Sequence, residues 1–140
     1  MNATLQAQKV HAYRLTVLEG HLDTFGHVNN AVYLSLLEEA RWDLITTNGY
    51  GLDQIKQSGK GPVILEINIK FLRELKLREE IVIETRLQSY EKRIGVMIQE
   101  IKNDMGAVCT YAELKFGLFD TVARRLISPT QQWLRAIGSE

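Results

Sequence analysis

A long segment without glycine or proline constrains the fold more than any other feature of this sequence. Residues 31–47 are rich in Ala, Leu, Glu and Arg, all of which favour α-helices. Apolar side chains recur there at helical spacing: Val32, Tyr33, Leu36, Leu37, Ala40, Leu44 and Ile45. The segment therefore predicts one long helix over residues 31–47.

The residues at both ends support this helix, and two further side chains predict how deeply it is buried. Asn29 or Asn30 can supply the N-cap, because an asparagine side chain accepts backbone N–H groups at a helix start. The Asn-Gly pair at residues 48–49 is typical of a helix end. Leu34 and Trp42 widen the apolar surface beyond one stripe, so we expect a helix that is buried on most sides.

Most of the remaining sequence alternates apolar and polar residues, which is typical of half-buried strands. The predicted strands cover residues 10–19, 63–71, 81–87, 94–101, 107–119 and 125–127. We expect a loop over residues 50–62, hairpin turns at residues 88–92 and 103–106, and a last helix with Pro129 in its first helical position. Short turns require antiparallel pairing, and the sheet needs an apolar partner for one face. The fold class is therefore α+β, with one antiparallel sheet wrapped around one long buried helix and a single domain over residues 1–140.

Composition narrows the function classes. The chain has 140 residues with 17 basic and 17 acidic side chains, so its net charge of zero argues against a nucleic-acid-binding protein. No apolar run approaches the ~18 residues of a membrane helix, and the N-terminus lacks an apolar signal sequence. The single cysteine, Cys109, cannot form an intrachain disulfide, which fits a reducing compartment. We therefore expect a cytoplasmic protein with no membrane or nucleic-acid partner.

The segment before the predicted helix carries the chemistry. Asp23 lies in a polar stretch just ahead of a helix N-terminus, where unpaired N–H groups can hold a developing oxyanion. A carboxylate at that place can act as a base or a nucleophile, and Gly26 permits a sharp bend close to a ligand. These residues indicate attack on a carbonyl group. The simpler alternative is that Asp23 only caps the turn, although Asn29 and Asn30 already offer caps.

Residues 21–34, HLDTFGHVNNAVYL, and residues 37–43, LEEARWD, closely resemble the hotdog-fold acyl-CoA thioesterases of the 4-hydroxybenzoyl-CoA thioesterase type. Within that family, these segments look most like those of the bacterial long-chain acyl-CoA thioesterases of FadM type. The strand at residues 67–71 and the following Arg73 also resemble the family. The resemblance implies a hotdog fold and hydrolysis of a fatty or aromatic acyl thioester of coenzyme A or acyl carrier protein, in lipid metabolism and without a cofactor. It also implies a homodimer or homotetramer with active sites at the subunit interface.

The resemblance also implies roles for individual residues. Asp23 falls on the catalytic carboxylate, and Asn30 on the residue whose backbone N–H polarises the thioester carbonyl. Gly26, His27, Tyr33 and Arg73 are expected to bind substrate. Independently of the resemblance, the charged run at residues 73–80 offers Arg73, Lys76 or Arg78 to the phosphates of coenzyme A, because cations bind phosphate strongly.

Each binding role has a structural alternative. His27 can shape the turn, Tyr33 can be a core residue, and the charged run at residues 73–80 can be a solvated loop. We expect no metal, because His21, Asp23 and His27 do not have a common metal-ligand spacing.

Three alternatives stay open on the sequence alone. Glu38 lies inside the helix, where another branch of hotdog thioesterases has its carboxylate. A hydratase or dehydratase on the same fold would use Asp23 and His27 as acid and base. A non-catalytic subunit would bind acyl-CoA without turnover, although the presence of Asp23 argues against it.

Overall fold

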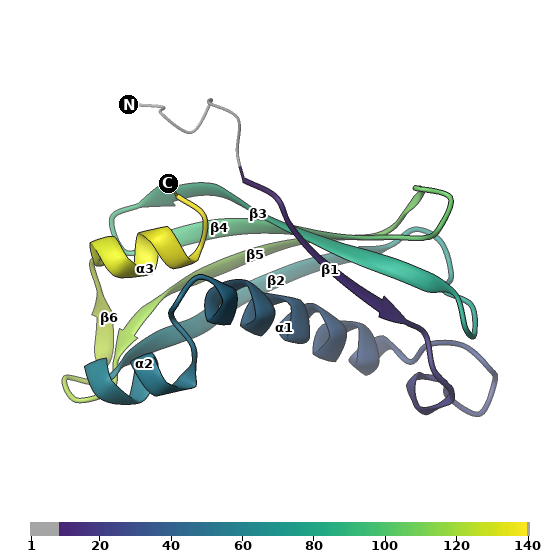
Figure 1. Cartoon of the computed structure of the whole chain (residues 1–140), viewed down its shortest axis with the longest axis horizontal. Coiled ribbons are helices and arrows are strands. Elements are labelled where there is room, and N and C mark those ends of the chain that lie inside the picture. The colour runs from purple at the N-terminus through teal and green to yellow at the C-terminus, as the bar shows by residue number, and fades with distance from the viewer. Residues whose placement is uncertain (1–8, 140) are drawn as a thin grey trace.

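The computed structural model describes residues 9–139, in which one curved antiparallel sheet lies along one long helix (Figure 1). The strands are β1 His11–Thr16, β2 Lys60–Phe71, β3 Glu80–Glu91, β4 Ile94–Lys102, β5 Val108–Asp120 and β6 Arg125–Ile127. The helices are a 3-10 helix Glu19–His21, α1 Asn30–Thr47, α2 Leu52–Ser58 and α3 Gln131–Ala136. None of the helices in residues 9–139 is both long and apolar enough to cross a bilayer.

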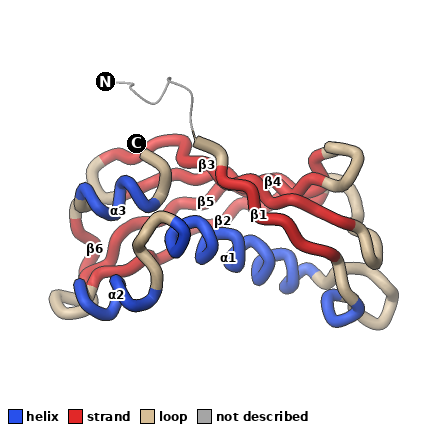
Figure 2. Tube along the Cα trace, in the orientation of Figure 1, coloured by secondary structure: helices blue, strands red, loops and turns tan. Residues whose placement is uncertain are grey.

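The strand order places β1 and β2 at the two ends of the sheet. The order is β1-β3-β4-β5-β2, with β6 added beside the end of β5, and every pair is antiparallel. Helix α1 crosses one face of the sheet. Helices α2 and α3 lie near the C-terminal end of α1 (Figure 2). The predicted α+β class, with an antiparallel sheet around one long helix, is confirmed.

Helix α1 buries only the face that it turns toward the sheet. Tyr33, Leu36, Leu37 and Ala40 pack into the main core cluster together with β3 and β5 side chains. Leu34 and Trp42 remain 41% and 38% exposed, so the prediction of a helix buried on most sides is wrong for the single chain. The reason is that the sheet ends at β2 and nothing else in residues 9–139 covers this side of α1.

The predicted helix ends are confirmed. The side chain of Asn29 accepts a hydrogen bond from the backbone N–H of Ala31 at 2.9 Å, so Asn29 is the N-cap and Asn30 the first helical residue. Asn48 is the C-cap, and Gly49 follows it with φ of +85°, a conformation that favours glycine.

Three boundaries differ from the predictions. The segment expected to be a loop contains α2, which ends at Gly59 in the left-handed conformation, and β2 begins at Lys60. Strand β3 continues through the expected turn at residues 88–92, because a β-bulge between Leu87 and Ser89 accommodates one extra residue. The first strand ends at Thr16 and is followed by the short 3-10 helix.

The start of the last helix was also predicted wrongly. Helix α3 begins at Gln131, because Thr130 is its N-cap and accepts a hydrogen bond from Trp133 N at 3.1 Å. Pro129 therefore precedes the cap instead of occupying the first helical position. The predicted turn at residues 103–106 is confirmed, since Asn103 Oδ1 accepts the N–H groups of Met105 and Ala107 at 3.0 and 2.9 Å.

Candidate active site

Asp23 organises the turn that leads into α1. Its Oδ1 accepts hydrogen bonds from the backbone N–H groups of Phe25 at 2.9 Å and His27 at 3.2 Å. Within residues 9–139 no hydrogen bond reaches its second carboxylate oxygen. One carboxylate oxygen of Asp23 therefore stabilises the turn, and the other is available to a ligand or a water molecule.

The N-terminus of α1 offers one N–H group without an acceptor. Ala31 N donates to the side chain of Asn29, and Val32 N and Tyr33 N both donate to the carbonyl oxygen of Asn29. The backbone N–H of Asn30 has no acceptor within the described part of the chain. Because the helix N-terminus also carries a partial positive charge, this group can stabilise a negatively charged oxygen.

Gly26 and His27 complete the turn. Gly26 has φ of +79° and donates its N–H to the carbonyl oxygen of Asp23 at 3.0 Å, a geometry in which another residue would be strained. The His27 ring is 65% exposed, and its Nε2 lies 3.6 Å from Glu74 Oε1. The ring therefore lies at the surface beside the turn. The local hydrogen bonds expected of His27 are made by its backbone and not by its ring.

Tyr33 lies one helical turn further along α1 and belongs to the core. Its side chain is 5% exposed, and its ring meets the edge of Phe71 with centroids 4.9 Å apart. Burial raises the pKa of the Tyr33 hydroxyl, while a hydrogen bond with the Leu75 backbone opposes the rise. The contact joins the start of α1 to the end of β2, so Tyr33 forms the wall behind the turn.

Arg73 lies in the neighbouring loop and lines a different hollow. Its backbone N–H donates to the carbonyl oxygen of Cys109 at 3.0 Å. Its side chain lines a surface hollow with Lys76, Arg78 and Asn103, among others. The structure thus brings Asp23, Gly26, His27 and Asn30 into one turn, with Tyr33 behind them and Arg73 outside.

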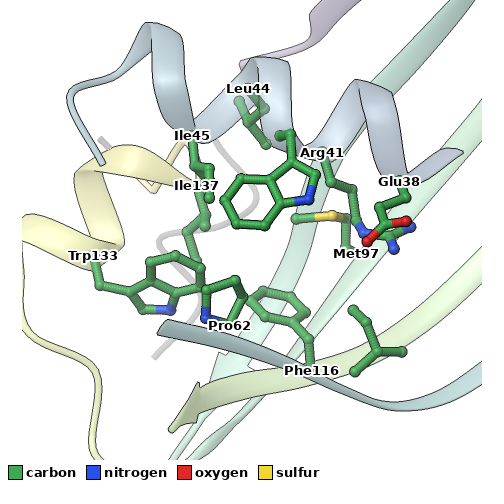
Figure 3. Close-up of a pocket in the computed structure, with 11 residues that line it drawn as sticks. Glu38, Arg41, Leu44, Ile45, Pro62, Met97, Phe116, Trp133 and Ile137 are labelled. Carbon is green, nitrogen blue, oxygen red and sulfur yellow. The ribbon is translucent and has the colours of Figure 1, made fainter. Parts of the chain in front are cut away.

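A largely apolar cavity was not predicted from the sequence. It has a volume of about 120 Å³ and lies between α1, α3 and the sheet (Figure 3). We call it the α1–α3 cavity; its main lining residues are Trp42, Ile45, Pro62, Met97, Phe116 and Trp133. No local sequence pattern indicates this cavity, because these residues come from five separate elements.

Glu38, the alternative catalytic carboxylate, lies at the edge of this cavity and not in the turn. It is exposed and stands beside Arg41 (Figure 3). Glu38 is distant from the turn, because it lies ~12 Å beyond Asn30 along the helix axis at a rise of ~1.5 Å per residue. Arg41 donates a hydrogen bond to the fully buried Gln99 at 3.0 Å.

No second reactive centre is evident in residues 9–139. No three His, Cys, Asp or Glu side chains cluster there closely enough to hold a metal ion. Cys109 is completely buried on β5, and burial raises the pKa of its thiol. A thiol of this kind is a poor nucleophile, since the thiolate is the reactive form.

Comparison with known proteins identifies the family. Residues 17–137 match the thioesterase-like superfamily. The chain is 32% identical over 109 residues to the long-chain acyl-CoA thioesterase FadM of Escherichia coli, covering 77% of this chain and 82% of the relative. The crystal structure of the probable thioesterase YbaW from Escherichia coli is similar with a TM-score of 0.80 and 28% identity, over 90% of this chain and 95% of that one.

A more distant structure shows how general the fold is. The hypothetical protein SAV2348 from Staphylococcus aureus, solved in complex with CoA, has a TM-score of 0.86 at 16% identity, over 98% of this chain and 85% of that one. At this identity the likeness concerns the fold alone. Together, the sequence match over most of the chain and the shared sheet-and-helix architecture show that the chain belongs to the thioesterase-like superfamily and has the hotdog fold.

Proposed function

We propose that this thioester hydrolase cleaves acyl-CoA thioesters at the turn between Asp23 and Asn30. One observation carries the proposal: among residues 9–139, a carboxylate oxygen without a hydrogen-bond partner lies in the turn that leads directly to an N–H group without an acceptor. The first group can activate water or attack carbon, and the second can receive the carbonyl oxygen. The name of the Escherichia coli relative, a long-chain acyl-CoA thioesterase, supports this substrate class.

The reaction needs few further groups. Asp23 either takes a proton from the attacking water or attacks the carbonyl carbon itself, giving an anhydride that water then hydrolyses. In both routes an electron pair moves onto the carbonyl oxygen, where the Asn30 N–H stabilises it. Collapse of this intermediate breaks the C–S bond and expels a thiolate. Because a thiol has a pKa of about 8.5, the leaving group needs little protonation, and a second acid is unnecessary.

The other residues of the turn serve the substrate. Gly26 lets the backbone approach the thioester, since no Cβ projects at its positive φ. His27 contacts the substrate from its exposed position beside the turn, and Tyr33 forms the wall of the acyl pocket. No cofactor takes part. The single cysteine supports a reducing compartment, and we assign the enzyme to the cytoplasm.

Hydrolysis itself is the first expected result. The purified protein should release free thiol from at least one member of a panel of short, long and aromatic acyl-CoA thioesters. Added EDTA should leave the rate unchanged. A thiol reagent measures the reaction, and an enoyl-CoA thioester in the same panel tests for hydration by its loss of absorbance. Thiol release from no member of the panel, or hydration alone, would refute the proposed activity.

Arg73 is expected to bind the phosphates of coenzyme A. Arg73→Gln should raise KM for an acyl-CoA about 10-fold with little change in kcat, because a charge-assisted hydrogen bond contributes ~1.5–3 kcal/mol. An acyl pantetheine thioester, which lacks the nucleotide phosphates, is the matched substrate and should show no change. Steady-state kinetics on both substrates separates phosphate binding from a structural defect.

A second surface, around Arg93 and Arg125, is the alternative to Arg73 as the binding site for the phosphates of coenzyme A. Arg93 and Arg125 line a hollow at the opposite end of the sheet, and neither has a carboxylate within ion-pair distance among residues 9–139. If β2 pairs antiparallel with a partner's β2, this hollow lies near the partner's turn. A KM effect in Arg93→Gln and none in Arg73→Gln would move the phosphate site to this hollow.

The enzyme is expected to be a homodimer or a homotetramer built on pairing of the β2 edge. Strand β2 ends the sheet and exposes Leu65, Ile67 and Phe71, and α1 exposes Leu34 and Trp42. A long apolar edge strand invites pairing with another chain. Light scattering of the wild-type protein should therefore give at least a dimer.

Substitution on this edge should weaken the assembly. Ile67→Lys places a charge on the edge strand and is expected to shift the protein toward the monomer and to lower its activity. Val122→Lys, at an equally apolar but isolated exposed position, is the matched control. A stable wild-type monomer with full activity would contradict the expected assembly.

A further inference from the structure

We propose that the α1–α3 cavity binds the distal end of the substrate's acyl chain and thereby selects long chains. This inference rests on the proposed hydrolysis of acyl thioesters at the Asp23–Asn30 turn. The cavity is separate from that turn, since its lining on α1 begins at Glu38. It therefore adds a binding site for a part of the substrate that does not react.

The cavity has the right chemistry for a hydrocarbon end. Apart from Glu38 and Arg41, every side chain that lines it is apolar, and Trp133 and Phe116 are 1% and 2% exposed. A cavity of about 120 Å³ is close to the ~150 Å³ apolar cavity that binds benzene in another protein. It thus has room for a few methylene groups.

The polar groups lie on one side of the cavity. Figure 3 shows Glu38 and Arg41 at one edge, while Trp133 and Ile137 lie at the opposite edge. Glu38 and Arg41 come from the middle of α1, on the side nearer to the Asp23–Asn30 turn, and Trp133 comes from α3. The apolar end of the cavity toward α3 therefore suits the terminal carbons of a chain that enters from the side of the turn.

The position of the cavity sets the chain length. Its lining on α1 runs from Glu38 to Ile45, which lie ~12 Å and ~22 Å beyond Asn30 along the helix axis. Because C–C bonds are ~1.5 Å long, an extended chain advances about 1.3 Å per carbon and spans these distances with roughly 9 to 17 carbons. A short or aromatic acyl group held at Asn30 would end before the cavity.

Exposed apolar side chains lie on α1 and β2 near both the turn and the cavity. Leu34 and Trp42 on α1 and Ile67 and Phe71 on β2 are all at least 36% exposed. Phe71 contacts Tyr33 at the turn end, and Trp42 lines the cavity. An acyl chain lying between α1 and β2 would cover these side chains along its length.

The two tryptophans of the chain provide a direct measurement, because both Trp42 and Trp133 line the cavity. The probes are hexadecanoic acid without bromine, with bromine on the ω carbon, and with bromine on the α carbon. Bromine quenches tryptophan emission only at short range. We expect strong quenching by the ω-bromo acid, and no more quenching by the α-bromo acid than by the unlabelled acid. Equal quenching by both bromo acids, or by neither, would overturn the inference.

Substitutions test whether this site selects chain length. Ile45→Phe narrows the cavity and should lower kcat/KM for hexadecanoyl-CoA relative to hexanoyl-CoA at least ~10-fold, since even one methylene contact is worth about that much in discrimination. Ile45→Ala widens it and should shift the preference toward longer chains. Leu134→Phe, a part-buried α3 residue outside the lining, is the control. An unchanged chain-length profile in folded Ile45→Phe would refute selection by the cavity.

The bromine experiment keeps the two proposals distinguishable. Position-dependent quenching without hydrolysis of any acyl-CoA would support the cavity and refute the proposed activity. Hydrolysis without position-dependent quenching would support the proposed activity and refute binding of the acyl chain in the cavity. If Ile45→Phe does not fold, as circular dichroism would reveal, the quenching of the wild-type protein still decides whether the distal end reaches the cavity.

Discussion

Asp23→Asn is expected to lower kcat at least ~100-fold, the lower limit for the loss of a general base. The amide oxygen of asparagine can still accept the backbone N–H groups of Phe25 and His27, which Asp23 Oδ1 accepts in the structure. The turn should therefore keep its shape, and the loss should come from the missing carboxylate. Steady-state kinetics on the best acyl-CoA substrate measures the effect, and thermal unfolding shows that the fold is intact.

Two variants make this result specific. Asp104→Asn changes an exposed carboxylate outside the site and should leave kcat unchanged. Glu38→Gln removes the carboxylate at the edge of the α1–α3 cavity and should have a small effect on kcat. Near-normal activity of Asp23→Asn together with an inactive Glu38→Gln would assign the catalytic role to Glu38.

Asn30→Pro is expected to be nearly as damaging, whereas Asn30→Ala should be mild. Proline removes the backbone N–H, and the loss of one oxyanion donor costs about 2.7–4 kcal/mol in the transition state, or roughly 100- to 1,000-fold in kcat. Alanine keeps the N–H. It also leaves the helix cap in place, because the cap is Asn29 and not Asn30.

The structure makes the proline variant a fair test. Asn30 is the first residue of α1, where proline is well tolerated. Asn29 has φ of −67° and ψ of 144°, the extended conformation that a residue before proline prefers. Circular dichroism must show a folded variant before its rate is interpreted. Wild-type kcat in folded Asn30→Pro would mean that another group polarises the carbonyl, and a severe defect in Asn30→Ala would point to the side-chain amide.

Local sequence patterns were sufficient to predict the helix and strand segments and the turn between Asp23 and Asn30. The 3.6-residue period and the Asn29 cap defined α1 to within one residue, because helix formation depends on neighbours three and four positions apart. Alternation identified every strand, and Arg125–Ile127 was predicted without error. The Asp23–Asn30 segment folds through hydrogen bonds among its own residues, so sequence alone indicated its geometry.

Errors arose where a short segment depended on its surroundings. Helix α2 has only seven residues, and a helix of that length is not stable by itself. It packs Ile55 against a core cluster that includes Tyr50, Phe116 and Trp133. The bulge at residues 87–89 depends on the facing strand β4, which the sequence of β3 does not reveal. The exposed side of α1 depends on where the sheet ends.

The sequence by itself determined the secondary elements, the antiparallel α+β class and the position of Asp23 before the helix, because each depends on residues that are close along the chain. The tertiary structure decided the rest. It placed Arg73 in a neighbouring hollow and brought Trp42 and Trp133 together around one cavity. Such arrangements come from packing between distant segments, where the curvature of the sheet and the shapes of many side chains act together, and no local pattern records them.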